Sequence, residues 1–201
     1  MVAKSSLYPD AHGGTGQLRI IGGSWRSRRF TFPDAEGLRP TPDRVRETLF
    51  NWLAPYLSGA RVLDPFVGSG ALYLEALSRG ASMAMALDVN ANAIASLRKH
   101  LDTLSCGNGQ LLQSDAMRYL ENQSASIFDL VFLDPPFNRN LLGPVCELLE
   151  RKGWLAEHAW IYTESEAPPS GLGLPGNWRL HREKKAGQVH YALWQRGPTP
   201  A

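Results

Sequence analysis

The hydrophobic positions of this chain change their spacing at about residue 60. From there on, short apolar runs that suit buried strands alternate with stretches in which apolar residues recur at helical spacing. The expected strands cover 61–65, 83–89, 109–114, 128–134 and 159–164, and the expected helices cover 71–79, 91–104, 116–121 and 141–152. This alternation predicts an α/β fold in which a parallel sheet carries helices on both faces.

The end of the chain follows a different pattern. Two runs of strand character, 178–186 and 189–196, are separated only by Gly187 and Gln188. Such a short separation is typical of an antiparallel pair. The sequence therefore predicts a mostly parallel sheet of seven strands with an antiparallel last strand.

The segment before residue 60 comprises a tail, a small extension and the first helix of the main domain. Residues 1–16 are polar and rich in Gly, Ser and Pro, which indicates a flexible tail. Apolar runs at 18–21 and 29–32 predict a β-hairpin within a basic extension over 17–42. Asp43 is expected to cap a helix that runs to about Tyr56. This helix opens the main domain, which we place at 43–197.

Composition limits the class of protein. A chain of 201 residues with 43% hydrophobic residues can form one domain with a substantial core. It has no apolar run of the about 20 residues that span a bilayer, and its first residues lack a signal-peptide pattern. We therefore expect a cytoplasmic protein with no membrane partner. Cys106 and Cys146 have neither zinc-ligand nor disulfide spacing, which predicts free buried thiols and no metal site.

The net charge of +2 does not identify a partner, but the distribution of charge is informative. Residues 17–32 contain no acidic side chain and carry Arg19, Arg26, Arg28 and Arg29, interleaved with Trp25 and Phe30. Arginines can contact phosphates, and aromatic rings can stack on bases. The pattern favours RNA binding by the hairpin; the alternative is an ordinary solvated surface.

The first expected strand ends in a glycine-containing loop. Asp64 is followed by Gly68, Ser69 and Gly70, and a helix comes next. Glycines allow a tight turn and a close approach of backbone to a ligand. A dinucleotide fingerprint needs a small residue at position 73, where Tyr73 would obstruct close helix–strand packing. The loop suits a ligand without a pyrophosphate, whose ammonium group Asp64 can hold, and Phe66 and Ser69 are further candidate cofactor contacts.

Acids also follow the next two expected strands. Asp88 can accept hydrogen bonds from the two ribose hydroxyls of an adenosine, or it can cap the next helix. Asp115, which precedes Ala116, can accept a hydrogen bond from an adenine amino group, and it also suits a helix cap. Both positions are therefore candidate cofactor contacts, with capping as the alternative.

The fourth expected strand runs directly into Asp134, Pro135, Pro136 and Phe137. An aromatic amine is a poor nucleophile, so a site that methylates it must accept hydrogen bonds from its NH2 group. The Asp134 carboxylate and the Pro135 carbonyl are suitable acceptors. The prolines stiffen the loop, and Phe137 offers a face for a flipped base. Because ligands of such sheets bind at the carboxyl ends of the strands, this motif and the Asp64 loop are expected to face one another.

These two motifs carry a family resemblance. Residues 64–72 resemble motif I of the class I methyltransferases, and residues 134–137 resemble motif IV of their amino-methylating branch. Over 17–196 the chain is similar to the bacterial 16S rRNA guanine-N2 methyltransferases of the RsmD type. Further matching stretches lie at 19–26, 38–41, 43–52, 153–155 and 181–189.

The resemblance implies a Rossmann-like class I methyltransferase fold and S-adenosylmethionine as the methyl donor. It implies a mostly monomeric enzyme that methylates a specific guanine of 16S rRNA, of the 966 type, in the small ribosomal subunit. In relatives the segment that lines the cofactor pocket corresponds to Arg39, Thr41 and Arg44. One departure is Ala86, where the family usually has a ribose-binding glutamate; Asp88, one strand period later, is the candidate substitute.

Three alternatives remain at this stage. An adenine-N6 or cytosine-N4 methyltransferase would use the same Asp-Pro-Pro-Phe chemistry, because each of these bases presents an NH2 group. A nicotinamide-dependent oxidoreductase is disfavoured by Tyr73. A non-catalytic RNA-binding module is disfavoured by the intact 134–137 motif.

Overall fold

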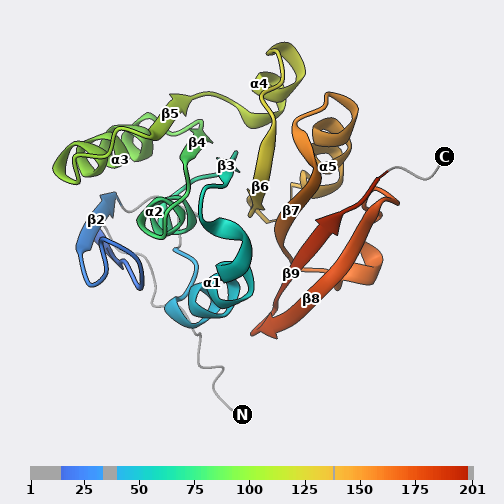
Figure 1. Ribbon diagram of the computed structural model, residues 1–201, viewed down its shortest axis with the longest axis horizontal. Helices are drawn as coiled ribbons and strands as arrows, with labels where there is room; N and C mark the ends of the chain where they lie inside the picture. Colours follow the sequence, from blue (N-terminus) through green and yellow to red (C-terminus); the bar gives the residue numbers. More distant parts are fainter. Residues whose placement is uncertain (1–14, 34–39, 138, 199–201) are drawn as a thin grey trace, which may run out of the picture.

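A seven-stranded sheet forms the centre of the molecule (Figure 1). The computed structural model describes residues 15–33, 40–137 and 139–198. The strands of this sheet are β3 (Arg61–Asp64), β4 (Met83–Asp88), β5 (Gly109–Gln113), β6 (Phe128–Leu133), β7 (Leu155–Ser165), β8 (Trp178–Ala186) and β9 (Val189–Arg196). Their spatial order is β5-β4-β3-β6-β7-β9-β8. Strands β3 to β7 pair in parallel, whereas β9 is antiparallel to both β7 and β8, so the predicted fold is confirmed.

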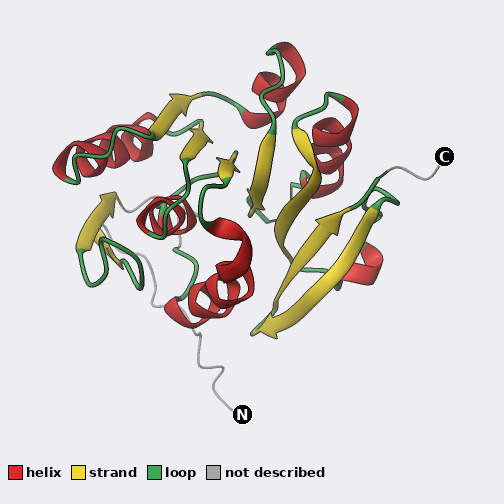
Figure 2. Ribbon diagram, in the orientation of Figure 1, coloured by secondary structure: helices red, strands yellow, loops and turns green. Residues whose placement is uncertain are grey.

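Helices cover both faces of this sheet (Figure 2). Helices α1 (Asp43–Leu57), α2 (Ala71–Ser78) and α3 (Ala91–Thr103) pack on one face, and α4 (Ala116–Asn122) and α5 (Leu142–Arg151) pack on the other. Side chains alternate between the two cores along each strand. Phe132 of β6 contributes to the α1–α3 core, whereas its neighbours Val131 and Leu133 contribute to the α4–α5 core. A short 3-10 helix, Pro169–Gly171, lies between β7 and β8.

The strand order places a topological switch point between β3 and β6. From β3 the chain proceeds outward through β4 to β5, and it then returns to β6 on the other side of β3. Ligands of open α/β sheets bind at the carboxyl ends of the strands at such a point. The residues that follow β3 and β6 are therefore the natural candidates for a site.

The N-terminal hairpin is a separate two-stranded sheet that packs beside α3 (Figure 1). Its strands are β1 (Thr15–Arg19) and β2 (Arg29–Pro33), with Leu18 paired to Phe30. Leu18, Ile20, Phe30 and Phe32 are all buried in the α1–α3 core. The Thr31 carbonyl accepts a hydrogen bond from His100 Nε2 of α3 at 2.8 Å. The hairpin is thus an integral layer of the domain.

Two local expectations are wrong. Tyr73 does not obstruct the packing of α2: it is fully buried, and its hydroxyl donates a hydrogen bond to the Gln110 carbonyl at 3.3 Å. Gly109 makes the room, because a Cβ there would lie 2.5 Å from the Tyr73 hydroxyl oxygen. Asp43 does not cap α1; it is the first residue of the helix, after Pro42, and its carboxylate binds Arg19 and Arg46 instead.

Two composition-based expectations can be compared with the structure. Cys106 and Cys146 are both free thiols, but of the two predicted buried thiols only Cys146 is buried, and Cys106 is half-buried. In the part of the chain that the structure describes, none of the helices combines the length and the apolar character needed to cross a bilayer.

Candidate active site

The loop between β3 and α2 is fixed by its glycines. Gly68 and Gly70 have φ angles of +50° and +81°, in the left-handed region that favours glycine. A Cβ on Gly70 would lie 2.2 Å from Cδ2 of Leu97 on α3. The Gly70 N–H donates to the Val67 carbonyl at 2.8 Å, which closes the turn directly before Ala71 begins α2. The expected tight turn is present, and it allows a ligand to approach the backbone closely.

Asp64 lies at the carboxyl end of β3 and is only 4% exposed. Burial raises the pKa of its carboxyl to about 8; a hydrogen bond from the Phe66 backbone opposes the rise, and the charge of Asp88 adds to it. None of the ion pairs among the described residues involves Asp64. A buried carboxyl without a protein cation beside it suits a cationic ligand group.

Asp88, at the end of β4, binds the backbone of the same loop. Its carboxylate accepts hydrogen bonds from the Gly68 N–H at 2.9 Å and from the Asn90 N–H at 2.7 Å. The cap of α3 is Asn90, whose side chain accepts from the N–H groups of Asn92 and Ala93, so the capping alternative for Asp88 is wrong. Each Asp88 oxygen retains acceptor capacity for a ligand hydroxyl. Ala86 is fully buried in the core.

Asp115 is the N-cap of α4 and accepts a hydrogen bond from the Arg118 N–H at 2.8 Å. Capping is therefore its structural role, and Ala116 is buried as the first residue of the helix. The Asp115 side chain remains exposed, so its second oxygen is accessible to a ligand.

Within the described residues, no three His, Cys, Asp or Glu side chains are grouped to hold a metal ion.

The Asp-Pro-Pro-Phe segment begins directly after β6 ends at Leu133. Asp134 is half-buried and Pro135 is buried, whereas Pro136 and Phe137 are exposed. Phe137 is 41% exposed, which leaves its ring accessible to a base. Since β6 pairs with β3 in parallel, Asp134 and Asp64 end neighbouring strands at the same edge. The two motifs therefore lie at the same edge of the sheet; that they form one site stays a prediction.

Sequence reasoning missed Glu164, near the end of the neighbouring strand β7. Glu164 is 7% exposed, and the Tyr162 hydroxyl donates a hydrogen bond to its Oε1 at 2.8 Å. Burial raises the pKa of Asp134 well above its usual range, and the charges of Glu164 and Asp64 raise it further. Burial also raises the pKa of Glu164 to about 7, against hydrogen bonds from Tyr162 and from the Thr41 side chain. The sequence did contain a signal for Glu164, because this acidic residue ends the expected strand 159–164.

Thr41, a candidate cofactor contact, thus lies beside Glu164 at this edge of the sheet. It is buried, and its carbonyl accepts a hydrogen bond from Arg46 Nε at 3.2 Å. Arg44 is exposed on α1. Arg39, the other candidate in this segment, lies outside the described residues.

The basic hairpin presents part of its expected surface to solvent. Arg26, Arg28 and Arg29 are exposed, and Trp25 is half-buried. Arg19 forms an ion pair with Asp43 at 2.9 Å, which engages part of its guanidinium. Phe30 is buried against His100, so it cannot stack on a base and the expectation that it contributes to the RNA surface is wrong.

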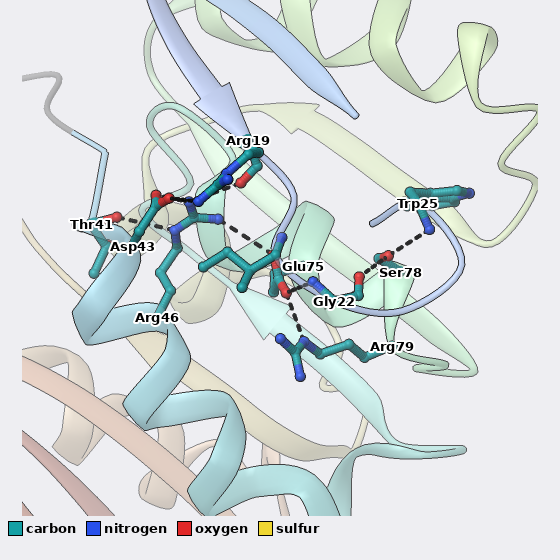
Figure 3. Close-up of polar contacts among 10 residues, drawn as sticks. Arg19, Gly22, Trp25, Thr41, Asp43, Arg46, Glu75, Ser78 and Arg79 are labelled. Atoms are coloured by element: carbon teal, nitrogen blue, oxygen red, sulfur yellow. Dashed lines mark hydrogen bonds and ion pairs between the residues drawn. The ribbon is translucent and has the colours of Figure 1, made fainter. Parts of the chain in front are cut away.

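A buried polar cluster fixes the hairpin to α2 (Figure 3). Glu75 is fully buried and accepts hydrogen bonds from the backbone N–H groups of Ile21 and Gly22 at 2.9 and 2.8 Å. It also forms ion pairs with Arg79 at 2.7 Å and with the buried Arg46 at 3.4 Å. Arg46 in turn donates to the Arg19 carbonyl at 2.9 Å. This cluster sets the position of the hairpin relative to the helix that follows the glycine loop.

Comparison with known proteins agrees with this architecture. The family described as Conserved hypothetical protein 95 matches residues 18–195. The chain belongs to this family. It is 54% identical over 185 residues to the Ribosomal RNA small subunit methyltransferase D of Escherichia coli, which covers 92% of this chain and 93% of that protein. The protein of the same name from Haemophilus influenzae is 44% identical over 183 residues, with 90% and 94% covered.

A solved structure from Escherichia coli, described as putative methyltransferase yhhF, shares the fold with a TM-score of 0.85. It is 54% identical in sequence and covers 92% of this chain and 100% of its own. The resemblance to the RsmD type is thereby confirmed, and the fold is that of the class I methyltransferases.

Proposed function

We propose that this protein transfers a methyl group from S-adenosylmethionine to N2 of a specific guanine of 16S rRNA, in the small ribosomal subunit. The observation that carries the proposal is the Asp-Pro-Pro-Phe segment after β6, beside the glycine loop after β3. Relatives that share most of the chain are named as methyltransferases of small-subunit ribosomal RNA. The enzyme acts as a monomer in the cytoplasm and needs no metal in this proposal.

The residues around the glycine loop fit this cofactor. Gly68 and Gly70 adopt the left-handed conformation that this tight turn needs, and the turn lies at the carboxyl end of β3, where we place the cofactor. Asp64 holds the ammonium group, and Asp88 holds the ribose hydroxyls. The remaining proposed contacts are Phe66, Thr41, Asp115, Ala116 and Arg39. When bound, the cofactor supplies an electrophilic methyl group.

The residues after β6 act on the target amine. The Asp134 carboxylate and the Pro135 carbonyl accept its hydrogen bonds, and Phe137 stacks on the flipped base. As the amine nitrogen bonds to the methyl carbon, the methyl–sulfur bond would break and S-adenosylhomocysteine would leave; the amine loses one proton, and Asp134 is the acceptor placed beside it. No covalent intermediate with the enzyme is involved. Most of the rate enhancement then comes from orientation and from the exclusion of water.

Cofactor affinity is expected to depend on pH through Asp64. Its pKa of about 8 means that the carboxyl is mostly protonated at pH 7, whereas an ammonium group binds the ionised form. Binding therefore releases a proton, and affinity rises about tenfold per pH unit from pH 6 until it levels off near pH 8. Calorimetry in buffers of different ionisation enthalpy measures this release. Asp64→Asn binds weakly with no such slope; a flat wild-type profile would contradict the assignment.

We propose that the exposed arginines of the hairpin contact rRNA phosphates. Trp25 and Arg19 are proposed to contact the RNA at the edge of the same surface. Changing Arg26, Arg28 and Arg29 together to Gln is expected to weaken binding of small subunits. The slope of log K against the logarithm of the salt concentration is expected to become less steep by roughly 2 to 3. Filter binding at several salt concentrations measures both quantities.

The matched control for this experiment carries the same charge change on the opposite face of the sheet. It consists of Arg118→Gln, Arg151→Gln and Lys152→Gln, in or directly after α4 and α5. We expect its salt dependence to equal that of the wild type. Equal effects of the two triple variants would show that only net charge matters and would remove the hairpin from the proposed interface.

The test of the proposed function is product identification. Purified protein is incubated with methyl-labelled S-adenosylmethionine and small subunits from cells that lack the enzyme, and the digested rRNA is analysed for labelled nucleosides. N2-methylguanosine is the expected product. N6-methyladenosine or N4-methylcytidine would instead favour the alternative that the same motif permits. Absence of label in rRNA, despite cofactor binding, would overturn the substrate assignment.

A further inference from the structure

Glu164 lies beside the proposed base-binding segment. Strands β6 and β7 are parallel, and Leu133 pairs with Thr163. The next residue on each strand is Asp134 or Glu164, so their backbones are about 4.8 Å apart, the spacing of adjacent strands. Strand alternation places both side chains on the face that Phe132 and Tyr162 share, which is the α1–α3 side. The two carboxyl groups are therefore neighbours at the carboxyl edge of the sheet.

The Glu164 carboxyl is held in place by neutral donors. The fully buried Tyr162 donates to Oε1 at 2.8 Å, and the Thr41 side chain approaches from the segment before α1. None of the ion pairs among the described residues includes Glu164 or Asp134. A carboxylate has about four acceptor positions, so these two donors leave capacity for more. Glu164 is thus a fixed acceptor at the edge where the base is proposed to bind.

The bases that carry an exocyclic amine differ in the atom beside it. Guanine presents its N2 amine next to a ring N1–H, which is a second donor. Adenine and cytosine present their amines next to a ring nitrogen lone pair, which is an acceptor. In their ionised forms the two adjacent carboxyl groups can accept from both guanine donors, and these hydrogen bonds favour ionisation against the burial that raises both pKa values. With adenine or cytosine, one of the two carboxylates would face a lone pair. A buried acceptor left without its donor carries a large penalty, and this is how polar sites reject a near-isosteric substrate.

We infer that Glu164 is the residue that selects guanine: it accepts a hydrogen bond from ring N1–H of the base whose amine is bound by Asp134. The inference rests on the proposed function and extends it from the reacting amine to the choice of base. It assigns Tyr162 the role of a positioning residue, because this tyrosine orients the Glu164 carboxyl.

The test uses a base that keeps the 2-amino group and lacks the N1 hydrogen. Small subunits are reconstituted with 16S rRNA that carries either guanine or 2-aminopurine at the methylated position, and single-turnover methylation is measured for each. The wild type is expected to prefer guanine by at least about 100-fold. Glu164→Gln is close to isosteric and can turn its amide to donate to the N1 lone pair. We expect it to reduce the preference by at least about tenfold, through a lower rate on guanine and a higher rate on 2-aminopurine.

Tyr162→Phe is the control for a purely structural role. It removes the hydrogen bond but keeps the carboxylate, so we expect slower reaction on both bases with a preference closer to that of the wild type. If Glu164→Gln slows both substrates equally, Glu164 has only a structural role. If the wild type methylates both bases equally, N1–H is not recognised, which overturns the inference without any variant. Failure of the proposed function has a different signature, because the wild type would then produce no N2-methylguanosine.

Discussion

Asp134→Ala reduces the rate of methyl transfer by about 100- to 1,000-fold, the range seen when one preorganised charge-stabilising group is removed from an active site. The carboxylate is proposed to accept a hydrogen bond from the amine and then its proton. With alanine, the amine keeps only the Pro135 carbonyl as an acceptor. Single-turnover kinetics with saturating cofactor and small subunits measures this step without interference from product release.

Cofactor binding separates loss of chemistry from loss of structure in this variant. Asp134 lies after β6, whereas the proposed cofactor contacts follow β3, β4 and β5 or lie in the segment before α1. Cofactor affinity measured by calorimetry is therefore expected to stay within about threefold of the wild type, a difference below 1 kcal/mol. Asp134→Asn keeps one acceptor oxygen and is expected to fall between the wild type and the alanine variant. Turnover by Asp134→Ala within tenfold of the wild type would remove Asp134 from the proposed mechanism.

The sequence predicted the fold, and it predicted where in the fold most candidate site residues lie, because both depend on local patterns. Strand β6 is mostly apolar, and Asp134 follows it directly. The edge of the sheet at which Asp134 lies could therefore be predicted without a structure. The glycine loop is local in the same way. Asp64 and Asp134 could be placed at one edge because parallel strands share the direction of their carboxyl ends.

The errors concern contacts between residues distant in sequence. Phe30 lies among arginines in the sequence, yet it packs against His100, 70 positions away, because the hairpin docks on α3. Tyr73 fits only because Gly109 leaves space on β5. Arg46 and Glu75 would be assigned to solvent by charge alone, but both are completely buried. No local pattern contains these pairings, since each depends on how two elements meet.

Glu75→Ala is expected to have the largest effect on stability, about 3–5 kcal/mol in the free energy of unfolding. The Glu75 carboxylate pairs with Arg46, whose side chain is 1% exposed, and with Arg79. It also accepts hydrogen bonds from the backbone of the hairpin at Ile21 and Gly22. Alanine leaves the buried Arg46 guanidinium with the partly exposed Asp43 as its remaining anion. It also leaves the Ile21 and Gly22 N–H groups without their acceptor and removes the anchor that fixes the hairpin on α2. A loss of this size is a large share of the about 5–15 kcal/mol of a typical domain.

Urea denaturation measures this loss, and Glu121→Ala is the matched control. Glu121 also pairs with two cations, Arg151 at 2.6 Å and Lys152 at 3.0 Å, but all three side chains reach solvent. Solvent screens such pairs, so its unfolding midpoint is expected to stay near that of the wild type. Hydrogen exchange at Ile21 and Gly22 locates the change, because these amides lose their acceptor in Glu75→Ala. Similar midpoints for the two variants, with unchanged exchange in the hairpin, would mean that apolar packing of Leu18, Ile20 and Phe32 alone holds the hairpin to the domain.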